Sequence, residues 1–193
     1  MTMKFQTSGK RKTPIRIVAI GGLSLAAIAL SACSVLGSRH PVGNPSVPPP
    51  AKRVEVDRYL GRWFEIARYE QSFQKGCEAV TADYSLRLDG SIEVVNRCRK
   101  PDGTFSQARG RAKVVSQGGA KLKVSFFGPF YGDYWVLDRA EDYGWAIVGE
   151  PSGRYLWILA RNATPAAQEV DNLVGRAQSL GYDTSMLIYT RQP

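Results

Sequence analysis

The sequence predicts an all-β protein: an eight-stranded antiparallel up-and-down β-barrel with one C-terminal α-helix and a short last strand. After residue 53, short segments rich in Val, Ile, Tyr, Phe and Trp alternate with turns at close, fairly even intervals. The turns carry pairs such as Asp89-Gly90 and Asp102-Gly103, whose residues tolerate the positive φ that tight hairpins require. Apolar residues recur at helical spacing near the C-terminus, where one amphipathic helix can cover the barrel wall.

Each segment rich in Val, Ile, Tyr, Phe and Trp predicts one strand. Eight are expected, near residues 62–70, 78–88, 91–98, 105–115, 121–127, 133–139, 143–149 and 155–161. Thr164 is expected to cap the helix, Pro165 to occupy its first position and Gly181 to follow its end. Met186 to Thr190 forms the last strand. A closed barrel of this size has an interior that side chains can fill or that can hold one small ligand.

Residues 1–32 have the pattern of a secretory signal peptide. Basic residues precede an uncharged apolar run, Ile17 to Leu30, which is short for a membrane span and is followed by small residues. The end of this region, Leu30-Ser31-Ala32-Cys33, resembles the lipobox of bacterial lipoproteins. That resemblance implies that Cys33 receives a diacylglyceryl thioether, becomes the mature N-terminus and carries a further acyl chain, such as palmitate, on its amine. An ordinary signal peptide with a chance cysteine is the alternative.

The segment from Cys33 to residue 53 is expected to be a flexible linker that holds the folded domain, residues 54–193, near the bilayer. It is rich in Pro, Gly and Ser and lacks apolar periodicity. Ser34 follows the cysteine, where an Asp would resemble the inner-membrane retention signal, so we expect the outer membrane, on its periplasmic face. Removing the signal peptide lowers the formal charge from +9 to +4, and the remaining basic residues are dispersed, which argues against a nucleic-acid partner.

Cys77 and Cys98 form an even pair once Cys33 is lipidated, and an exported protein meets an oxidising compartment. The residues between them look like two strands joined at Asp89-Gly90, which would bring the two cysteines together. A disulfide is therefore expected, provided that the two Cα atoms approach within about 7 Å. Two buried free thiols are the alternative.

Three local matches, taken in order, resemble the lipocalin family. Gly61-Arg62-Trp63 looks like the family's first-strand Gly-x-Trp, and Gly132-Asp133-Tyr134 stands where a Thr-Asp-Tyr-type motif occurs, with Gly in place of Thr. Arg161 stands where the family has an arginine that lies over the first-strand tryptophan and closes the barrel base. With the tracts RWFEIARY, VSFFGPFYGDYWVLD and YLWILAR, the chain is most similar to the bacterial outer-membrane lipoprotein subgroup, related to apolipoprotein D and the plant lipocalins, over roughly residues 54–191. The resemblance implies that Gly61, Trp63 and Arg161 are structural residues.

The resemblance also implies a small hydrophobic ligand, a fatty acid or a lysophospholipid, stored or carried at the envelope. Alternation along the strand 121–127 places three pocket candidates on one face, expected to point inward: Leu122, Val124 and Phe126. Tyr155 and Trp157 share a face of the eighth strand, and Tyr131 and Tyr134 carry hydroxyls for a polar head group. Filling the core is the alternative role of each residue. A barrel packed shut would make this an envelope structural or interaction lipoprotein.

A lipid-modifying enzyme is the weakest hypothesis, and no cofactor or metal is expected. His40, the only histidine, lies in the linker, which makes a Ser-His-Asp hydrolase hard to build. Cys77 and Cys98 lack a Cys-x-x-Cys or His partner set, and pairing them in a disulfide would block a cysteine nucleophile. Glu65 can face the interior, where a structural hydrogen-bonded carboxylate is the expectation. We therefore expect a binding protein; the sequence makes no prediction of its oligomeric state.

Overall fold

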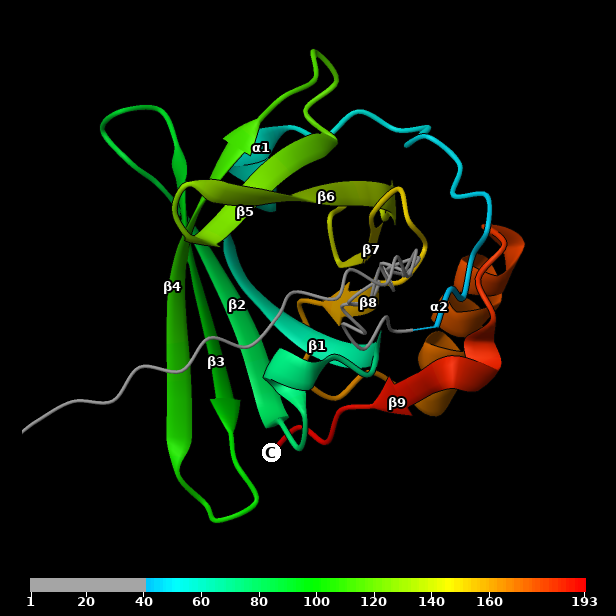
Figure 1. Cartoon of the computed structure of the whole chain (residues 1–193). Helices are drawn as coiled ribbons and strands as arrows, with labels where there is room; N and C mark the ends of the chain where they lie inside the picture. The colour runs from blue at the N-terminus through cyan, green and yellow to red at the C-terminus, as the bar shows by residue number, and fades with distance from the viewer. Residues whose placement is uncertain (1–40) are drawn as a thin grey trace, which may run out of the picture. The chain divides into compact units, whose positions relative to one another are not determined.

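The computed structural model describes residues 41–193, and these form an antiparallel barrel with one long helix on its outside (Figure 1). The sheet runs β2-β3-β4-β5-β6-β7-β8-β1-β9, and a further β1–β2 pairing closes it. The strands are β1 (Gly61–Tyr69), β2 (Glu78–Leu86), β3 (Ile92–Arg99), β4 (Phe105–Val114), β5 (Lys121–Phe127), β6 (Phe130–Arg139), β7 (Trp145–Gly149), β8 (Leu156–Ala160) and β9 (Leu187–Tyr189). The predicted up-and-down barrel is therefore confirmed.

The two ends of the barrel differ. At the closed end lie the short helix α1 (Val56–Tyr59) and the turns that join β2 to β3, β4 to β5 and β6 to β7. At the open end lie the other four connections, among them the β1–β2 loop with its 3-10 turn η1 (Ser72–Gln74). Sequence reasoning did not anticipate α1, because four residues are too few to show a helical period.

The starts of strand β6 and of helix α2 differ from the sequence prediction. Strand β6 begins at Phe130 instead of residue 133, because Phe127 and Phe130 pair directly across the β5–β6 turn. Helix α2 (Ala167–Ser179) has Ala166 as its N-cap, so the prediction that Thr164 caps it was wrong. Thr164 lies before the helix instead. Its backbone amide donates to the side-chain oxygen of Asn162, which closes a local turn.

The expected flexibility of residues 33–53 does not extend to residues 41–53. The backbone amide of Gly43 donates to Gly153 O at 2.9 Å, and buried Asn44 donates from its side chain to Leu180 O. Farther along, the carbonyl of Arg53 accepts from the guanidinium of buried Arg139. Sequence composition missed this because these bonds use backbone groups, which any residue supplies. Residues 33–40 lie outside the described part of the chain.

The C-terminal segment fills a gap between β1 and β2. These two strands pair only from Gly61 to Phe64, after which β9 takes the place of β2 beside β1. Beyond β9, the Arg191 carbonyl accepts from Ala79, and the side-chain amide of Gln192 donates to the backbone of both walls. The last residues of the chain therefore belong to the barrel wall.

Helix α2 covers the outer face of the wall, as its apolar stripe predicted. Buried Leu173 and Ala177 pack with Leu156 and Ile158 of β8 and with Tyr182 in one hydrophobic cluster. A second cluster occupies the barrel interior. Within residues 41–193, neither α1 nor α2 is long and apolar enough to cross a membrane.

The disulfide between Cys77 and Cys98 is present, with the two Cα atoms 5.3 Å apart, so that prediction is confirmed. It joins the β1–β2 loop to the end of β3. Because both places lie at the open end, the bond restrains that end, which carries the longest loop of the barrel.

Candidate functional site in the barrel interior

The floor of the interior is built around Trp63, which is fully buried. The guanidinium carbon of Arg161 lies 3.9 Å from the centre of the Trp63 ring, the stacked arrangement that the family resemblance implied. Arg161 also donates to the carbonyls of Arg62 and Leu60 at 2.6 and 2.7 Å. One cation thus holds β1 and the α1 connection together at the closed end. Gly61, with φ of +92°, supplies the left-handed turn between them.

Above the floor, three tyrosines meet at their hydroxyls. Tyr134 of β6 lies 2.8 Å from the Tyr59 hydroxyl and 2.9 Å from the Tyr84 hydroxyl. Burial raises the pKa of Tyr84 to about 12, and it raises the pKa values of Tyr59 and Tyr134 well above the ordinary value. All three groups are therefore neutral at physiological pH and act as hydrogen-bond donors and acceptors without charge.

This tyrosine cluster has one more hydroxyl proton than its internal hydrogen bonds use. Three neutral hydroxyls carry three protons, whereas the two hydroxyl contacts use only one proton each. Among the described residues, one O–H of the cluster is therefore available to another acceptor. Tyr134, half-buried, is the member of the cluster that is least enclosed.

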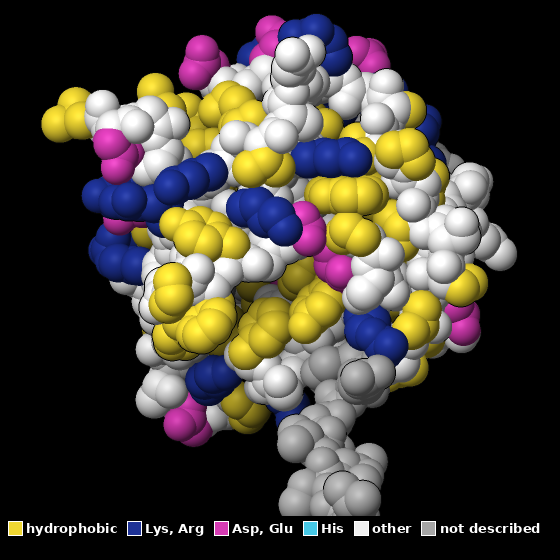
Figure 2. Space-filling view, turned by 45° about the horizontal axis from the view of Figure 1, so that its top comes forward, with side chains coloured by type: hydrophobic (Ala, Val, Ile, Leu, Met, Phe, Trp, Pro, Cys, Tyr) yellow, Lys and Arg dark blue, Asp and Glu magenta, His cyan; other side chains and the backbone are white. Residues whose placement is uncertain are grey.

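The interior is packed at the closed end and accessible toward the open end. Buried interior residues of the closed half include Trp63, Ile92, Ala112, Leu122 and Val136. Toward the open end the interior-facing side chains keep part of their surface accessible: Asn96, Val124, Phe126 and Trp157 are half-buried, and Ala108 is exposed. Figure 2 shows hydrophobic side chains gathered around a hollow in the surface.

Strand β4 explains why this half is not filled. Its inward positions carry the small residues Ser106, Ala108, Gly110 and Ala112, in alternation with long polar side chains that point outward. A Cβ added at Gly110 would lie 2.8 Å from the ring of Phe126, so the glycine makes room for that ring. Sequence reasoning missed this wall; the alternation of small residues with Gln107, Arg109 and Arg111 was the signal that could have identified it.

Most predicted pocket residues do lie on the inner face. Leu122, Val124, Phe126, Tyr134 and Trp157 all belong to the interior cluster or pack against it. Leu122 is buried in the closed half and contributes to the floor. Tyr155 stacks on Trp157, with ring centres 5.7 Å apart, near the open end.

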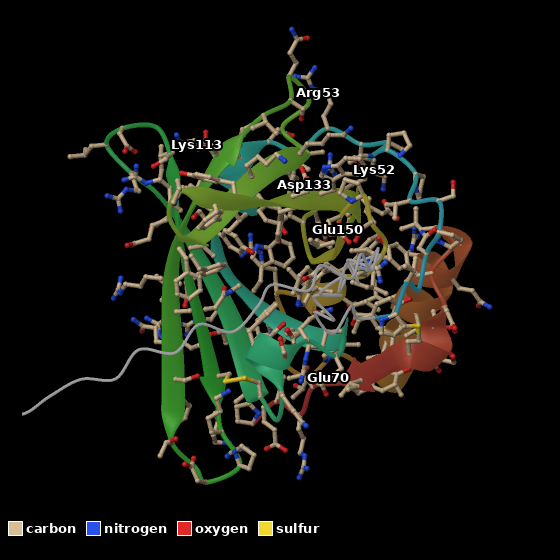
Figure 3. All side chains as sticks on the ribbon, in the orientation of Figure 1. Lys52, Arg53, Glu70, Lys113, Asp133 and Glu150 are labelled. Atoms are coloured by element: carbon tan, nitrogen blue, oxygen red, sulfur yellow. A yellow bond between two sulfur atoms is a disulfide. The ribbon has the colours of Figure 1, made fainter. Side chains whose placement is uncertain are left out.

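Tyr131 was predicted wrongly as a pocket residue. The amine of Lys113 lies over its ring, 5.7 Å from the centre, and Lys113 alternates with inward-facing Ala112. Asp133 lies on the same outer face, where its carboxylate pairs with Lys123 at 2.9 Å (Figure 3). The expectation failed because Tyr131 and Tyr134 are three residues apart on β6, so the alternation of a strand places their side chains on opposite faces.

The buried carboxylate of Glu65 has a full set of partners. Its two oxygens accept from the Arg68 guanidinium, the Thr190 hydroxyl and the Gln74 side-chain amide. Gln74 in turn accepts from the indole N–H of Trp157 at 2.9 Å. Glu65 is therefore a structural carboxylate that ties β1 to the open-end loop and to the C-terminal segment, as expected for a buried acid.

Comparisons with known proteins agree with this architecture. Residues 54–192 match the family described as lipocalin-like domain. The outer membrane lipoprotein Blc of Vibrio cholerae is 42% identical over 170 residues, which cover 86% of this chain and 98% of that protein. Apolipoprotein D of Mus musculus is 36% identical over 87% of this chain and 93% of its own length.

A solved structure shows the same fold at greater distance. Insecticyanin from the tobacco hornworm Manduca sexta superimposes with a TM-score of 0.62 at 20% identity, over 79% of this chain and 88% of that one. The closed barrel, the Arg161–Trp63 stack at its base and the sequence relatives lead to one conclusion. This chain belongs to the lipocalin family.

Proposed function

We propose that this protein is a lipid-anchored lipoprotein of the outer membrane, on its periplasmic face, whose barrel binds one fatty acid or lysophospholipid. Lipocalins are binding proteins for small hydrophobic molecules, and the bacterial relatives are named outer membrane lipoproteins. The anchor is Cys33, within the lipobox-like sequence that lies outside the described residues. The proposed role is storage or transport of lipids during maintenance of the envelope.

The accessible half of the interior is the observation that supports a ligand most directly. Side chains of Val124, Phe126 and Trp157 give this space apolar walls, and β4 contributes small residues that leave room. Transfer of an acyl chain from water to such walls contributes about 25 cal/mol for each Å² of apolar surface buried. A barrel packed shut, the second hypothesis from the sequence, would have buried Ala108 as completely as it buries Ala112.

The tyrosine cluster supports a ligand whose polar group carries acceptor oxygens. Its spare O–H lies among apolar residues, where a hydrogen bond to a charged oxygen is worth roughly 1.5–3 kcal/mol. A carboxylate or a phosphate oxygen meets that need. Asn96 adds a side-chain oxygen that is buried without a partner among the described residues and can accept from a ligand hydroxyl.

Ligand titration tests this function. We would prepare the chain from Ser34 onward, remove bound lipid, and follow the fluorescence of the four tryptophans during addition of oleate or a lysophospholipid. One saturable site at micromolar concentration or below is expected. Tyr134→Phe should weaken binding of the preferred lipid roughly tenfold, because a hydrogen bond to its charged head is lost. Absence of saturation with both lipids would exclude the carrier function and favour a structural role.

A further inference from the structure

We propose that the open end of the barrel docks on the lipid bilayer that holds the anchor, so that the ligand passes directly between bilayer and barrel. The inference rests on the lipid anchor of the proposed function. Two independent features of the described residues point to it: the place where the chain joins the barrel, and the side chains that surround the open end.

The chain joins the barrel at its open end. Gly43 is fixed there by its hydrogen bond to Gly153, which lies in the turn between β7 and β8. From Gly43 the chain runs along the outside to the closed end, where Val54 donates to Gly118 in the β4–β5 turn. In Figure 3, Arg53 lies at the top of the view and Glu70, which follows β1, lies at the opposite side of the barrel.

This point of attachment limits how the anchored protein can face the membrane. Nine residues lie between Cys33 and Gly43, and the ten steps from one Cα atom to the other span at most about 35 Å when fully extended. Tilted strands of nine or ten residues give the barrel a height of roughly 25 Å. With the closed end on the bilayer, most of that reach would be used to pass along the barrel. With the open end on the bilayer, the anchor and Gly43 are neighbours.

The open end also carries exposed aromatic side chains, which we call the phenylalanine rim: Phe73, Phe105, Phe127 and Phe130. Their exposed fractions lie between 62% and 82%. They lie within or directly beside three of the four open-end connections, and Phe127 and Phe130 flank the tip of the β5–β6 hairpin. Large apolar side chains at loop tips are costly in water and gain stability in the acyl–headgroup boundary of a bilayer.

Charged side chains contribute little to the attraction between the open end and a bilayer. Exposed Lys75 and half-buried Lys100 lie in the open-end connections together with exposed Glu70 and Asp102. Opposite charges in similar number give no strong attraction to anionic headgroups. Docking through the phenylalanine rim should therefore be equally strong on zwitterionic and anionic bilayers.

A pair of cysteine variants tests the orientation in the lipidated full-length protein. Gly128→Cys places a label at the tip of the β5–β6 hairpin, and Gly118→Cys places one in the β4–β5 turn at the closed end. The two sites are matched, because an added Cβ meets nothing within 4 Å at either glycine. With the protein in phosphatidylcholine vesicles, lipids spin-labelled near the headgroup should quench an environment-sensitive fluorophore at position 128 at least threefold more than at position 118.

Two serine variants then test the rim in the Gly128→Cys protein. Phe73→Ser/Phe127→Ser/Phe130→Ser should reduce quenching at least threefold, whereas Leu86→Ser/Leu88→Ser/Val115→Ser, which removes exposed apolar side chains at the closed end, should leave it unchanged. Adding anionic phosphatidylglycerol to the vesicles should not change the result. Stronger quenching at position 118, equal quenching at both sites, an unlipidated Cys33 by mass spectrometry, or no effect of the rim variant would overturn the docking proposal.

Ligand binding is measured separately on the same proteins. The rim variant should bind oleate in solution as tightly as the parent protein, because its substituted side chains lie outside the interior cluster. Loss of oleate binding in the parent protein contradicts the proposed function but leaves the quenching result intact. Loss of quenching with normal oleate binding contradicts the docking proposal alone.

Discussion

The closed and open halves of the barrel interior are built on the same strands by the same alternation, yet one is packed and the other accessible. On β4, Ala112 is completely buried, whereas Ala108, four residues away on the same inner face, is exposed. The difference lies in what each residue faces. The closed half is filled by Tyr59 of α1, by Leu60 directly after it and by the ring of Trp63, whereas no comparable side chains from residues 41–193 fill the open half. The accessible space in this barrel therefore begins where the side chains that pack the closed half end.

Replacing one tryptophan in each half should give the largest difference. Trp63→Ala removes the fully buried floor and the partner of Arg161, which is expected to reduce the free energy of unfolding by about 4 kcal/mol. Trp157→Ala removes a half-buried ring and one hydrogen bond to Gln74, for a loss of about 2 kcal/mol or less. Guanidinium unfolding followed by circular dichroism measures both. Equal losses would show that the open half is packed as tightly as the floor.

Replacing Ala112 and Ala108 of β4 with a larger residue tests the difference between the closed and open halves directly. Ala112→Phe overpacks the closed half and is expected to cost about 1–3 kcal/mol of stability. Ala108→Phe projects into accessible space, so stability should change by less than about 1 kcal/mol while the affinity for oleate falls at least tenfold. Denaturant unfolding and fluorescence titration on the same samples separate the two effects. Unchanged affinity in Ala108→Phe would place the ligand elsewhere.

The tyrosine cluster, which lies above the floor, should give a smaller effect that appears at alkaline pH. The pKa of Tyr84 is raised to about 12 in the folded protein, above the ordinary value near 10. A raised pKa means that folding favours the protonated phenol, so this contribution is complete below pH 10 and is lost as the pH rises from 10 toward 12. At pH 11 Tyr84 alone should cost about 1 kcal/mol relative to pH 9.

Urea midpoints at pH 9, 10 and 11, together with phenolate absorbance, measure this loss. Tyr84→Phe removes the titrating group and serves as the control, so its stability should fall less steeply over the same interval. Identical slopes for the two proteins would mean that the Tyr84 hydroxyl is not buried in the folded state.

Local sequence patterns predicted the strands well, because each strand carries its own alternation and is bounded by its own turn residues. Strand β5 was predicted with its observed ends, and Asp89-Gly90 forms the expected β2–β3 turn. The pairing of Cys77 with Cys98 also followed, since a hairpin joins the two cysteines. The inward face of Leu122, Val124 and Phe126 followed from a period of two.

Other features depended on contacts between segments far apart in the chain. Tyr131 is an exception, because alternation along β6 already places it opposite Tyr134, and the strand was predicted to begin only at residue 133. The attachment of residues 41–53 to the barrel uses backbone carbonyls of distant turns, and composition alone made that segment resemble a linker.

The sequence by itself determined the fold class, the disulfide and the residues at the barrel base, because periodicity, turn chemistry and short motifs are properties of neighbouring residues. Only the tertiary structure decided which half of the interior is filled, which hydroxyls meet in the tyrosine cluster, and at which end the chain joins the barrel. Those outcomes depend on strand register and on the packing of α1 and the C-terminal segment across long sequence separations. The identity of a side chain determines whether it can be buried. The closure of the sheet determines in which part of the barrel it is buried.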